Sequence, residues 1–251
     1  MIPFMVNSIE AIFLDVGNTL RILLKEEPHR AAAREKIVAM IGTEADPVAF
    51  CAELDRRYKV YRKWAFEELT EAPETELWTR WLAPEFPREH IEPLAHELTY
   101  QFRQSMGRRV NAEGGKEVVA ELHRRGYTLG IISNVITTQE VPDWLHDEGL
   151  DQYFTSVVLS SLYGRRKPHH SLYVEAARRA KTSPEKCVYV GDNFSRDVEG
   201  TRAAGFGMVI IMPDPGEKDD PVPPQYQPDL VIHSLRDLLD VFPGPTNHKD
   251  N

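Results

Sequence analysis

The fold is decided by the stretch Ile9-Glu-Ala-Ile-Phe-Leu-Asp-Val-Gly-Asn-Thr-Leu20. Apart from Glu10, its first six residues form a short apolar run with β-branched members, which is typical of a strand buried on both faces. The run ends at a carboxylate, Asp15, and Gly17-Asn18 follow it as a turn signal. The stretch therefore predicts a buried strand whose carboxyl end carries Asp15 into a loop.

Beyond Gly114-Gly115 the chain alternates between apolar and amphipathic segments. We predict strands at residues 127–132, 156–159, 187–190, 207–211 and 230–233. We predict helices at residues 116–125, 138–147, 169–180 and 195–204, and a short last helix that ends at 241. Strands that alternate with helices indicate a parallel sheet covered by helices on both faces. The predicted fold class is α/β, with a doubly wound parallel sheet.

Residues 28–107 differ in character from the rest of the chain. Their apolar residues recur at spacings of three and four, prolines stand near the segment starts, and no strand signal interrupts them. We predict a helical block here, with hinges at residues 20–28 and 107–115. Seven of its side chains are candidates for substrate specificity, although we expect the tryptophans to pack between helices: Tyr58, Tyr61, Arg62, Trp64, Trp78, Arg80 and Trp81.

Composition limits the classes of partner. The 251 residues carry 30 Lys and Arg against 39 Asp and Glu, a formal charge of −9, which argues against nucleic acid but not against a small anion in a local basic pocket. No apolar run approaches the roughly 18 to 20 residues that cross a bilayer, and the start of the chain does not resemble a signal peptide. We therefore expect no membrane contact. The two cysteines, Cys51 and Cys187, lie far apart and form no metal-ligand spacing, which is typical of buried thiols in the reducing cytoplasm. Nothing in the sequence indicates an oligomeric state.

Polar residues follow several of the predicted strands. Asp15, Ser133-Asn134 and Asp192 each stand at a strand end, and ligands of open α/β sheets bind beyond the carboxyl ends of the strands. We therefore expect these side chains to meet at one edge of the sheet. Asp15 can serve there as a nucleophile or a metal ligand, or can simply cap its turn.

Further residues near these strand ends are candidates for binding. Thr19, Ser133 and Asn134 can hydrogen-bond an anion, although each also fits an ordinary turn. Lys167 follows two arginines, so it is either part of a solvated basic loop or a cation beside Asp15 that offsets phosphoryl charge. Asp192 and Asp197 flank a strand-to-helix turn, where hard carboxylate oxygens suit Mg²⁺.

Four motifs in this order resemble those of the haloacid dehalogenase superfamily: Asp15-Val-Gly-Asn-Thr-Leu20, Ser133-Asn134, Lys167-Pro168 and Gly191-Asp192 with Asp197. The match spans about residues 9–212, and the helical block resembles the family's inserted α-helical cap. The resemblance implies a Rossmann-like core at residues 1–22 and 110–245 and a cap at residues 23–109. Residues 246–251 are then a polar tail.

The resemblance also implies roles for the matching residues. Asp15 would attack the substrate phosphorus and form an aspartyl-phosphate that water hydrolyses, while Ser133 hydrogen-bonds the transferring group and Lys167 neutralises its charge. Asp192 would hold Mg²⁺ with Asp15 and the backbone carbonyl of Gly17, and Asp197 would support these ligands. The expected protein is a Mg²⁺-dependent phosphatase acting on a small phosphorylated metabolite.

Gly17 departs from the family's usual pattern. Most phosphatases of the family carry at this position a second aspartate, which protonates the leaving oxygen, and glycine has no side chain. General acid–base help is typically worth about 10²–10⁴-fold in rate. A phosphatase of this kind would need good leaving groups or an acid from the cap, for which Lys25, Glu26 and His29 are candidates.

Two other interpretations stay open. The first is a hydrolase of carbon–halogen or carbon–phosphorus bonds in the same superfamily. Dehalogenases lack the second aspartate but also work without Mg²⁺. Hydrolases of carbon–phosphorus bonds keep Mg²⁺ and use an imine-forming cap lysine, for which Lys59 or Lys63 would be candidates. A catalytically impaired protein would bind a phosphorylated ligand without turnover. The Gly191-Asp192 motif argues against dehalogenation, and the joint presence of Asp15, Lys167 and Asp192 argues against a protein without turnover.

Overall fold

The computed structural model describes residue 6, residues 8–214 and residues 223–244. Its main sheet is parallel and has six strands in the order β5-β4-β1-β6-β7-β8, which confirms the predicted fold class. The strands are β1 (Ala11–Leu14), β4 (Thr128–Ser133), β5 (Phe154–Leu159), β6 (Cys187–Gly191), β7 (Met208–Ile211) and β8 (Leu230–Val231). β1 lies between β4 and β6, so the ends of these three strands are neighbours.

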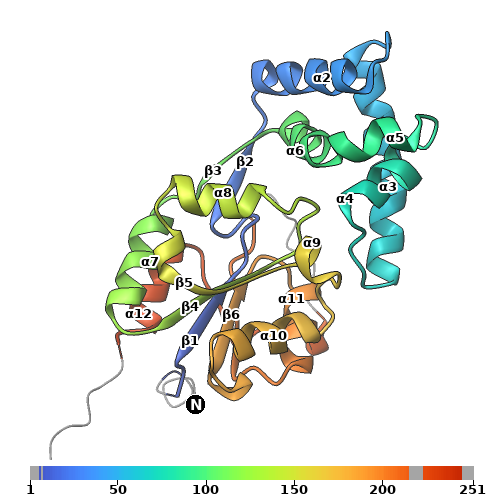
Figure 1. Ribbon diagram of the computed structural model, residues 1–251. Coiled ribbons are helices and arrows are strands. Elements are labelled where there is room, and N and C mark those ends of the chain that lie inside the picture. The colour runs from blue at the N-terminus through green and yellow to red at the C-terminus, as the bar shows by residue number, and fades with distance from the viewer. Residues whose placement is uncertain (1–5, 7, 215–222, 245–251) are drawn as a thin grey trace, which may run out of the picture.

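Helices cover both faces of this sheet (Figure 1). Alternate residues of β1 point to opposite faces: Ile12 and Leu14 pack with α7 (Gly115–Arg124), α8 (Glu140–Asp147) and α12 (Leu238–Val241), while Ala11 and Phe13 pack with α10 (Ser171–Arg179). Because helices bury both faces of β1, both sets of alternate residues are apolar. The core also contains two further helices, α9 (Ser160–Tyr163) and α11 (Arg196–Ala203). It has four short 3₁₀ turns: η3 (Asp151–Tyr153), η4 (Pro184–Lys186), η5 (Pro224–Tyr226) and η6 (Leu235–Asp237).

The predicted helical block forms a separate body beyond the carboxyl ends of the strands (Figure 1). It contains α2 (Glu27–Ile41), α3 (Pro47–Glu67), α4 (Glu74–Glu76), the π-helical η1 (Leu77–Leu82), α5 (Arg88–Ile91), the 3₁₀ turn η2 (Glu92–Leu94) and α6 (Ala95–Met106). Its apolar side chains form a cluster that also takes in Ile136, from the loop after β4. Trp78 belongs to this cluster, is fully buried and donates its indole N–H to Thr99 Oγ1 at 2.9 Å. The tryptophan packing that we expected holds for this residue.

Among the described residues, the apolar cluster of the helical block is distinct from the clusters on the two faces of the sheet. This separation supports the division into a core at residues 1–22 and 110–245 and a cap at residues 23–109. We keep these boundaries as a proposal. The predicted polar tail, residues 246–251, lies outside the described residues. Among the helices that the structure describes, none combines the length and the apolar character needed to cross a membrane.

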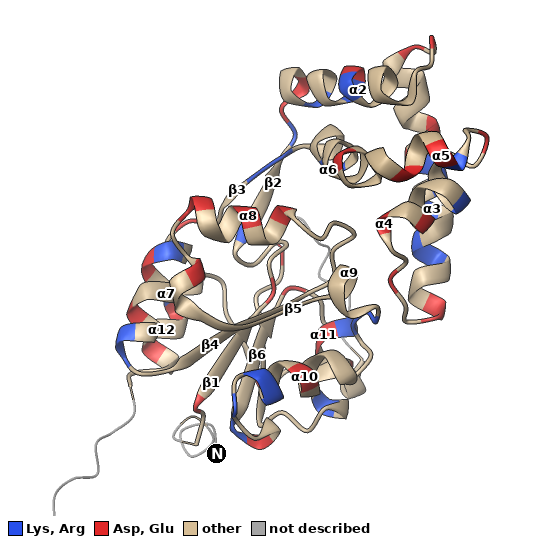
Figure 2. Ribbon diagram, viewed as in Figure 1, with Lys and Arg blue, Asp and Glu red and all other residues tan. Residues whose placement is uncertain are grey.

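The two predicted hinges contain strands that sequence reasoning missed. β2 (Arg21–Leu24) and β3 (Arg108–Asn111) pair antiparallel as a two-stranded ribbon between the sheet and the helical block (Figure 2). Each strand has only four residues and lacks the alternation of apolar and polar residues that marks a strand in a sequence. Neither strand could therefore be predicted from its sequence. Gly107 precedes β3 with φ 149°, and a Cβ there would lie 2.6 Å from the carbonyl oxygen of Leu24. Glycine is therefore needed where the chain enters the ribbon.

Candidate active site

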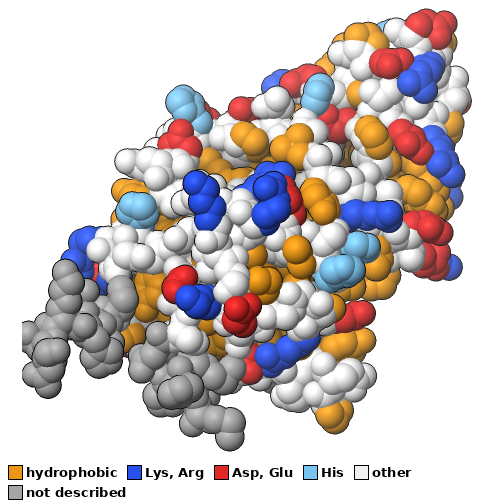
Figure 3. All heavy atoms as spheres, turned by 60° about the horizontal axis from the view of Figure 1, so that its bottom comes forward, with side chains coloured by type: hydrophobic (Ala, Val, Ile, Leu, Met, Phe, Trp, Pro, Cys, Tyr) orange, Lys and Arg blue, Asp and Glu red, His pale blue; other side chains and the backbone are white. Residues whose placement is uncertain are grey.

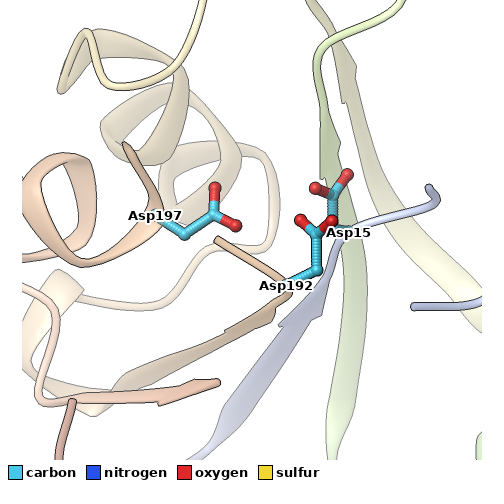
Figure 4. A group of neighbouring side chains, drawn as sticks. All are labelled: Asp15, Asp192 and Asp197. Atoms are coloured by element: carbon cyan, nitrogen blue, oxygen red, sulfur yellow. The ribbon is translucent and has the colours of Figure 1, made fainter. Parts of the chain in front are cut away.

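Two strand ends and the start of one helix bring the predicted acidic residues to one place. Asp15 follows β1 and Asp192 follows β6, while Asp197 lies in the first turn of α11 (Figure 4). Each of the three side chains offers a carboxylate oxygen, and these oxygens all lie within 4.8 Å of one another. The convergence that the sequence predicted at this edge of the sheet is therefore present.

The Asp15 carboxylate is held by donors from three segments. Oδ1 accepts hydrogen bonds from Ser133 Oγ at 2.6 Å and from the backbone N–H of Val16 at 2.7 Å. Oδ2 accepts one from Lys167 Nζ at 2.6 Å. Asp15 is only 4% exposed and the Lys167 side chain is fully buried, so little water screens this ion pair. These contacts fix the orientation of a carboxylate that a ligand in the adjoining cavity can reach.

Asn134 positions Lys167. Its Oδ1 accepts the backbone N–H of Lys167 at 2.8 Å, and its Nδ2 donates to the Lys167 carbonyl at 3.1 Å. Both amide atoms thus bind the backbone of the lysine. Asn134 also lines the cavity beside Asp15, so its contact with substrate stays a prediction. The sequence showed an amide at a strand end but not the distant loop that it holds.

Asp197 and Tyr189 complete the environment of Lys167. Lys167 Nζ lies 3.0 Å from Asp197 Oδ1 and donates to Tyr189 Oη at 2.5 Å. Burial raises the pKa of Asp197, but ion pairs with Lys167 and Arg196 outweigh burial and leave that pKa below its usual value. Asp197 is therefore a buried anion that holds the lysine in place.

Arg196 lies among the three carboxylates, where the sequence predicted Mg²⁺ and Lys167 but no arginine. Its Nη2 is 3.1 Å from Asp192 Oδ1 and 3.8 Å from Asp15 Oδ2, and its Nε is 3.3 Å from Asp197 Oδ1. Burial, together with the charges of Asp15 and Asp197, raises the pKa of Asp192 to about 6. Arg196 belongs to the stretch between Asp192 and Asp197, but no pattern in that stretch separates it from a solvated helix residue.

The charges of this cluster favour a further cation. Asp15, Asp192 and Asp197 contribute three negative charges, whereas Lys167 and Arg196 contribute two positive ones. Carboxylate oxygens are the ligands that Mg²⁺ prefers. Gly17, whose carbonyl was predicted as a ligand, lines the same cavity as Asp15 and Asp192. The residues present therefore fit a divalent cation, with Arg196 as a competitor for Asp192.

A cavity of about 320 Å³ adjoins Asp15 and Asp192. The cavity also reaches the helical block through Tyr58 and Arg62, which were among the seven specificity candidates. The other five candidates do not line it: Tyr61, Trp64, Trp78, Arg80 and Trp81. Its most frequent lining residue is arginine, at positions 21, 62, 103, 109, 166 and 196, whereas Asp15 and Asp192 are the lining carboxylates. Most of this positive charge was not predicted, because its members are far apart in sequence.

Thr19 lies apart from this cavity. Its side chain is fully buried, it does not line the cavity, and its Oγ1 has no hydrogen-bond partner among the described residues. We therefore do not retain Thr19 as a contact to substrate. The sequence placed it correctly in the loop after β1 but could not show that it turns inward.

The acid candidates from the cap also lie elsewhere. Glu26 pairs with Arg108 at 2.7 Å, His29 contacts Gln104 Oε1 at 2.9 Å, and neither these two nor Lys25 lines the cavity beside Asp15. Lys59 and Lys63, the candidates for an imine-forming lysine, line a separate cavity that does not include Asp15. Within the described part of the chain, Asp15 and Asp192 are the only carboxylates that line the cavity beside Asp15.

Comparison with known proteins identifies the family. The sequence profile of haloacid dehalogenase-like hydrolases matches residues 48–211, which is most of the chain. The protein therefore belongs to the haloacid dehalogenase-like hydrolase family, as the four motifs indicated.

Relatives within this family include named phosphatases. The chain is 32% identical to the glyceraldehyde 3-phosphate phosphatase of Methanopyrus kandleri over 121 residues, 48% of this chain and 52% of the relative, so it spans about half of that protein's length. It is 28% identical to the phosphoserine phosphatase of Thermus thermophilus, with 91% of this chain and 97% of the relative covered.

Solved structures show the same fold. The 2-haloacid dehalogenase of Pseudomonas syringae pv. Tomato DC3000 superposes with a TM-score of 0.68 at 22% identity, covering 94% of this chain and 98% of that one. The magnesium-bound hydrolase YfnB of Bacillus subtilis superposes with a TM-score of 0.62 at 20% identity, covering 93% and 98%. At these identities the likeness concerns the architecture alone.

Proposed function

We propose that the protein is a Mg²⁺-dependent phosphatase that hydrolyses a small phosphorylated metabolite through an aspartyl-phosphate on Asp15. The observation that carries this proposal is the fixed Asp15 carboxylate, bound by Ser133, Val16 and Lys167 and placed beside Asp192 at a cavity of about 320 Å³. Relatives named as phosphatases of glyceraldehyde 3-phosphate, phosphoserine and phosphoglycolate support the same chemistry.

The proposed reaction has two steps. An Asp15 oxygen attacks phosphorus, the bond from phosphorus to the ester oxygen breaks, and the ester oxygen leaves with the electron pair of that bond as an alkoxide or phenolate. This anion then takes a proton from water and becomes the alcohol. Water then attacks the phosphorus of the acyl phosphate, releasing phosphate and restoring the carboxylate. Lys167, at 2.6 Å from Asp15, and Arg196 offset the phosphoryl charge, while Ser133 orients the nucleophile. Mg²⁺, when held by Asp15, Asp192 and the Gly17 carbonyl, supplies further charge neutralisation.

Hydrolysis of p-nitrophenyl phosphate tests the proposal, because its leaving group needs little protonation. We expect turnover with Mg²⁺ and its loss in excess EDTA, with recovery when Mg²⁺ is restored. Turnover that EDTA leaves intact would reject the metal dependence. Mg²⁺-dependent binding of phosphate analogues without any turnover would instead identify a phospho-ligand-binding protein.

Dehalogenation is a second candidate, because one specific observation favours it. Gly17 has no acidic side chain, and no other described carboxylate except Asp15 and Asp192 lines the cavity, while a halide leaves without a proton. Halide release from 2-haloacids in the presence of EDTA, with no release of phosphate from esters, would select this reaction over phosphate ester hydrolysis.

Gly17→Asp should increase the rate with poor leaving groups. A Cβ built at Gly17 meets nothing within 4 Å, so the loop has room for a side chain. A carboxyl group here can protonate the leaving oxygen, which is typically worth about 10²–10⁴-fold. We expect kcat for ethyl phosphate to rise by at least about 10-fold and kcat for p-nitrophenyl phosphate to change much less. Equal effects on both esters in a folded variant would show that the new carboxyl is no acid.

Arg196→Met should tighten divalent cation binding. Arg196 Nη2 is 3.1 Å from Asp192 and 3.8 Å from Asp15, so its removal leaves these two carboxylates with less compensation. We expect the Kd for Mn²⁺, measured by electron paramagnetic resonance, to fall by at least about 10-fold. Arg202→Met is the matched control, because Arg202 lies on the same helix and pairs with Asp229 at the surface. Unchanged or weaker binding in Arg196→Met would mean that the guanidinium does not compete with the cation.

We also propose a cytoplasmic location. Cys51 and Cys187 are both free and buried, as expected for a protein of a reducing compartment.

A further inference from the structure

The cavity beside Asp15 has a second charged wall, built by Arg21 of β2, Arg103 of α6 and Arg109 of β3 around Glu140 of α8. Arg21 Nη1 lies 3.2 Å and Arg109 Nε 3.5 Å from Glu140 Oε1, and Arg103 pairs with Glu140 Oε2. The four side chains are 3–17% exposed, so this cluster is enclosed rather than part of the surface. We call it the arginine triad.

The arginine triad carries more positive charge than Glu140, its only acidic partner in the described part of the chain, neutralises. Three guanidinium groups face one carboxylate, and none of the three has another ion-pair partner within the described residues. The Nε–H of Arg21 is buried and has no hydrogen-bond acceptor there. An enclosed cluster with two unbalanced positive charges and an unpaired donor costs free energy unless an anion completes it.

Electrostatics within the triad agree with this reading. Burial, with repulsion from Arg103, lowers the pKa of Arg109 to about 9, despite the attraction of Glu140. Burial likewise lowers the pKa of Arg21. Both shifts mean that the charged forms are held at a cost, which a bound anion would reduce. On the face drawn in Figure 3, by contrast, charges of both signs are interspersed.

The triad faces the reacting carboxylate with guanidinium groups alone. Arg21, Arg103 and Arg109 all line the cavity that includes Asp15, whereas Glu140 does not line it. Glu140 instead lines a larger cavity of about 770 Å³, which shares Arg21 and Arg109 but does not reach Asp15. A molecule whose phosphoryl group lies at Asp15 therefore meets positive charge on this wall.

We infer that the arginine triad is a subsite for a second anionic group of the substrate, so that the substrate is a phosphate monoester that also carries a carboxylate or a second phosphate. This inference rests on the proposed phosphatase function. A guanidinium group binds either anion through two parallel N–H donors, which gives geometric selectivity as well as charge. A phosphate ester with an uncharged alkyl group would leave the excess positive charge of the triad uncompensated.

Calorimetric binding of non-hydrolysable phosphonates in saturating Mg²⁺ tests the subsite without requiring turnover. Ethylphosphonate carries one anionic group, phosphonoacetate adds a carboxylate and ethylenebisphosphonate adds a second phosphonate. We expect one of the two doubly anionic ligands to bind about 10–100-fold more tightly than ethylphosphonate. The tighter of the two identifies whether the second group is a carboxylate or a phosphate.

Arg103→Gln and Arg109→Gln should each reduce this preference by at least about 10-fold. Either substitution leaves Glu140 with two guanidinium partners, so the buried carboxylate is not stranded. Arg108→Gln is the matched control: Arg108 neighbours Arg109 on β3 but pairs with Glu26 and does not line the cavity. The control should keep the preference of the wild type.

Two results would overturn the subsite. One is a wild type that binds both doubly anionic ligands no more tightly than ethylphosphonate, and the other is a preference that survives in both triad variants. The wild-type result requires no variant, so a variant that fails to fold does not remove the test. A preference with no hydrolysis of p-nitrophenyl phosphate would retain the subsite and reject the proposed phosphatase, whereas hydrolysis without preference would do the reverse.

Discussion

Asp15→Asn should lower kcat for p-nitrophenyl phosphate by on the order of 10⁴-fold or more, because an amide cannot form the acyl phosphate. Asn keeps the size of the side chain, and an amide oxygen can still accept the hydrogen bonds of Ser133 and Val16. Lys167 retains Asp197 at 3.0 Å as a partner, so we expect the variant to fold. The measurement is steady-state hydrolysis in Mg²⁺, together with a thermal melt.

The control for this substitution is Asp240→Asn, because Asp240 is an exposed residue of α12. It should leave kcat and Tm unchanged. Residual turnover of Asp15→Asn within about 10-fold of the wild type would show that another group attacks phosphorus. A variant that melts far below the wild type would have to be replaced by Asp15→Glu before the kinetic result is interpreted.

Lys167→Met should reduce both activity and stability. The Lys167 side chain is fully buried and pairs with Asp15 at 2.6 Å and Asp197 at 3.0 Å. Its removal leaves two buried carboxylates with Arg196 as their remaining cation, and loss of one partner from a buried pair costs about 3–5 kcal/mol. Loss of one preorganised donor at a transferring group costs about 10²–10³-fold in kcat.

Urea unfolding and single-turnover kinetics measure these two effects separately. Lys36→Met on the exposed surface of α2 is the control and should change neither. Added Mg²⁺ should recover part of the lost stability of Lys167→Met, because it compensates the same carboxylates. A Lys167→Met variant with wild-type stability and kcat would contradict the role given to this ion pair.

The parts of the site that the sequence predicted share one physical cause. Asp15, Ser133 and Asp192 stand at the ends of β1, β4 and β6, and neighbouring parallel strands bring such residues to the same edge whatever their separation in sequence. Apolar runs locate these strands, and the polar residue after each run locates the strand end. Asp197 and Lys167 do not stand directly after a strand. The residues alone made them candidates, and the family resemblance assigned their roles.

Most of the cavity's positive charge could not be predicted, because it depends on pairing without a local pattern. Arg21 and Arg109 meet Glu140 only after β2 and β3 form their ribbon, and neither strand has an alternating sequence. An arginine in a charged stretch is usually solvated, so Arg196 carried no signal either. The burial of the Thr19 side chain likewise depends on how the loop after β1 packs, which the sequence of the loop does not show.

Direct detection of the phosphorylated residue tests the central claim, that Asp15 is the nucleophile. The enzyme is mixed with p-nitrophenyl phosphate and Mg²⁺, quenched in acid during turnover, digested and analysed by mass spectrometry. We predict a mass increase of one phosphoryl group on the peptide that contains Asp15, removed by hydroxylamine as expected for an acyl phosphate. Turnover with a phosphoryl group on another residue, or with none on Asp15 in quenches across the pre-steady state, would contradict the account.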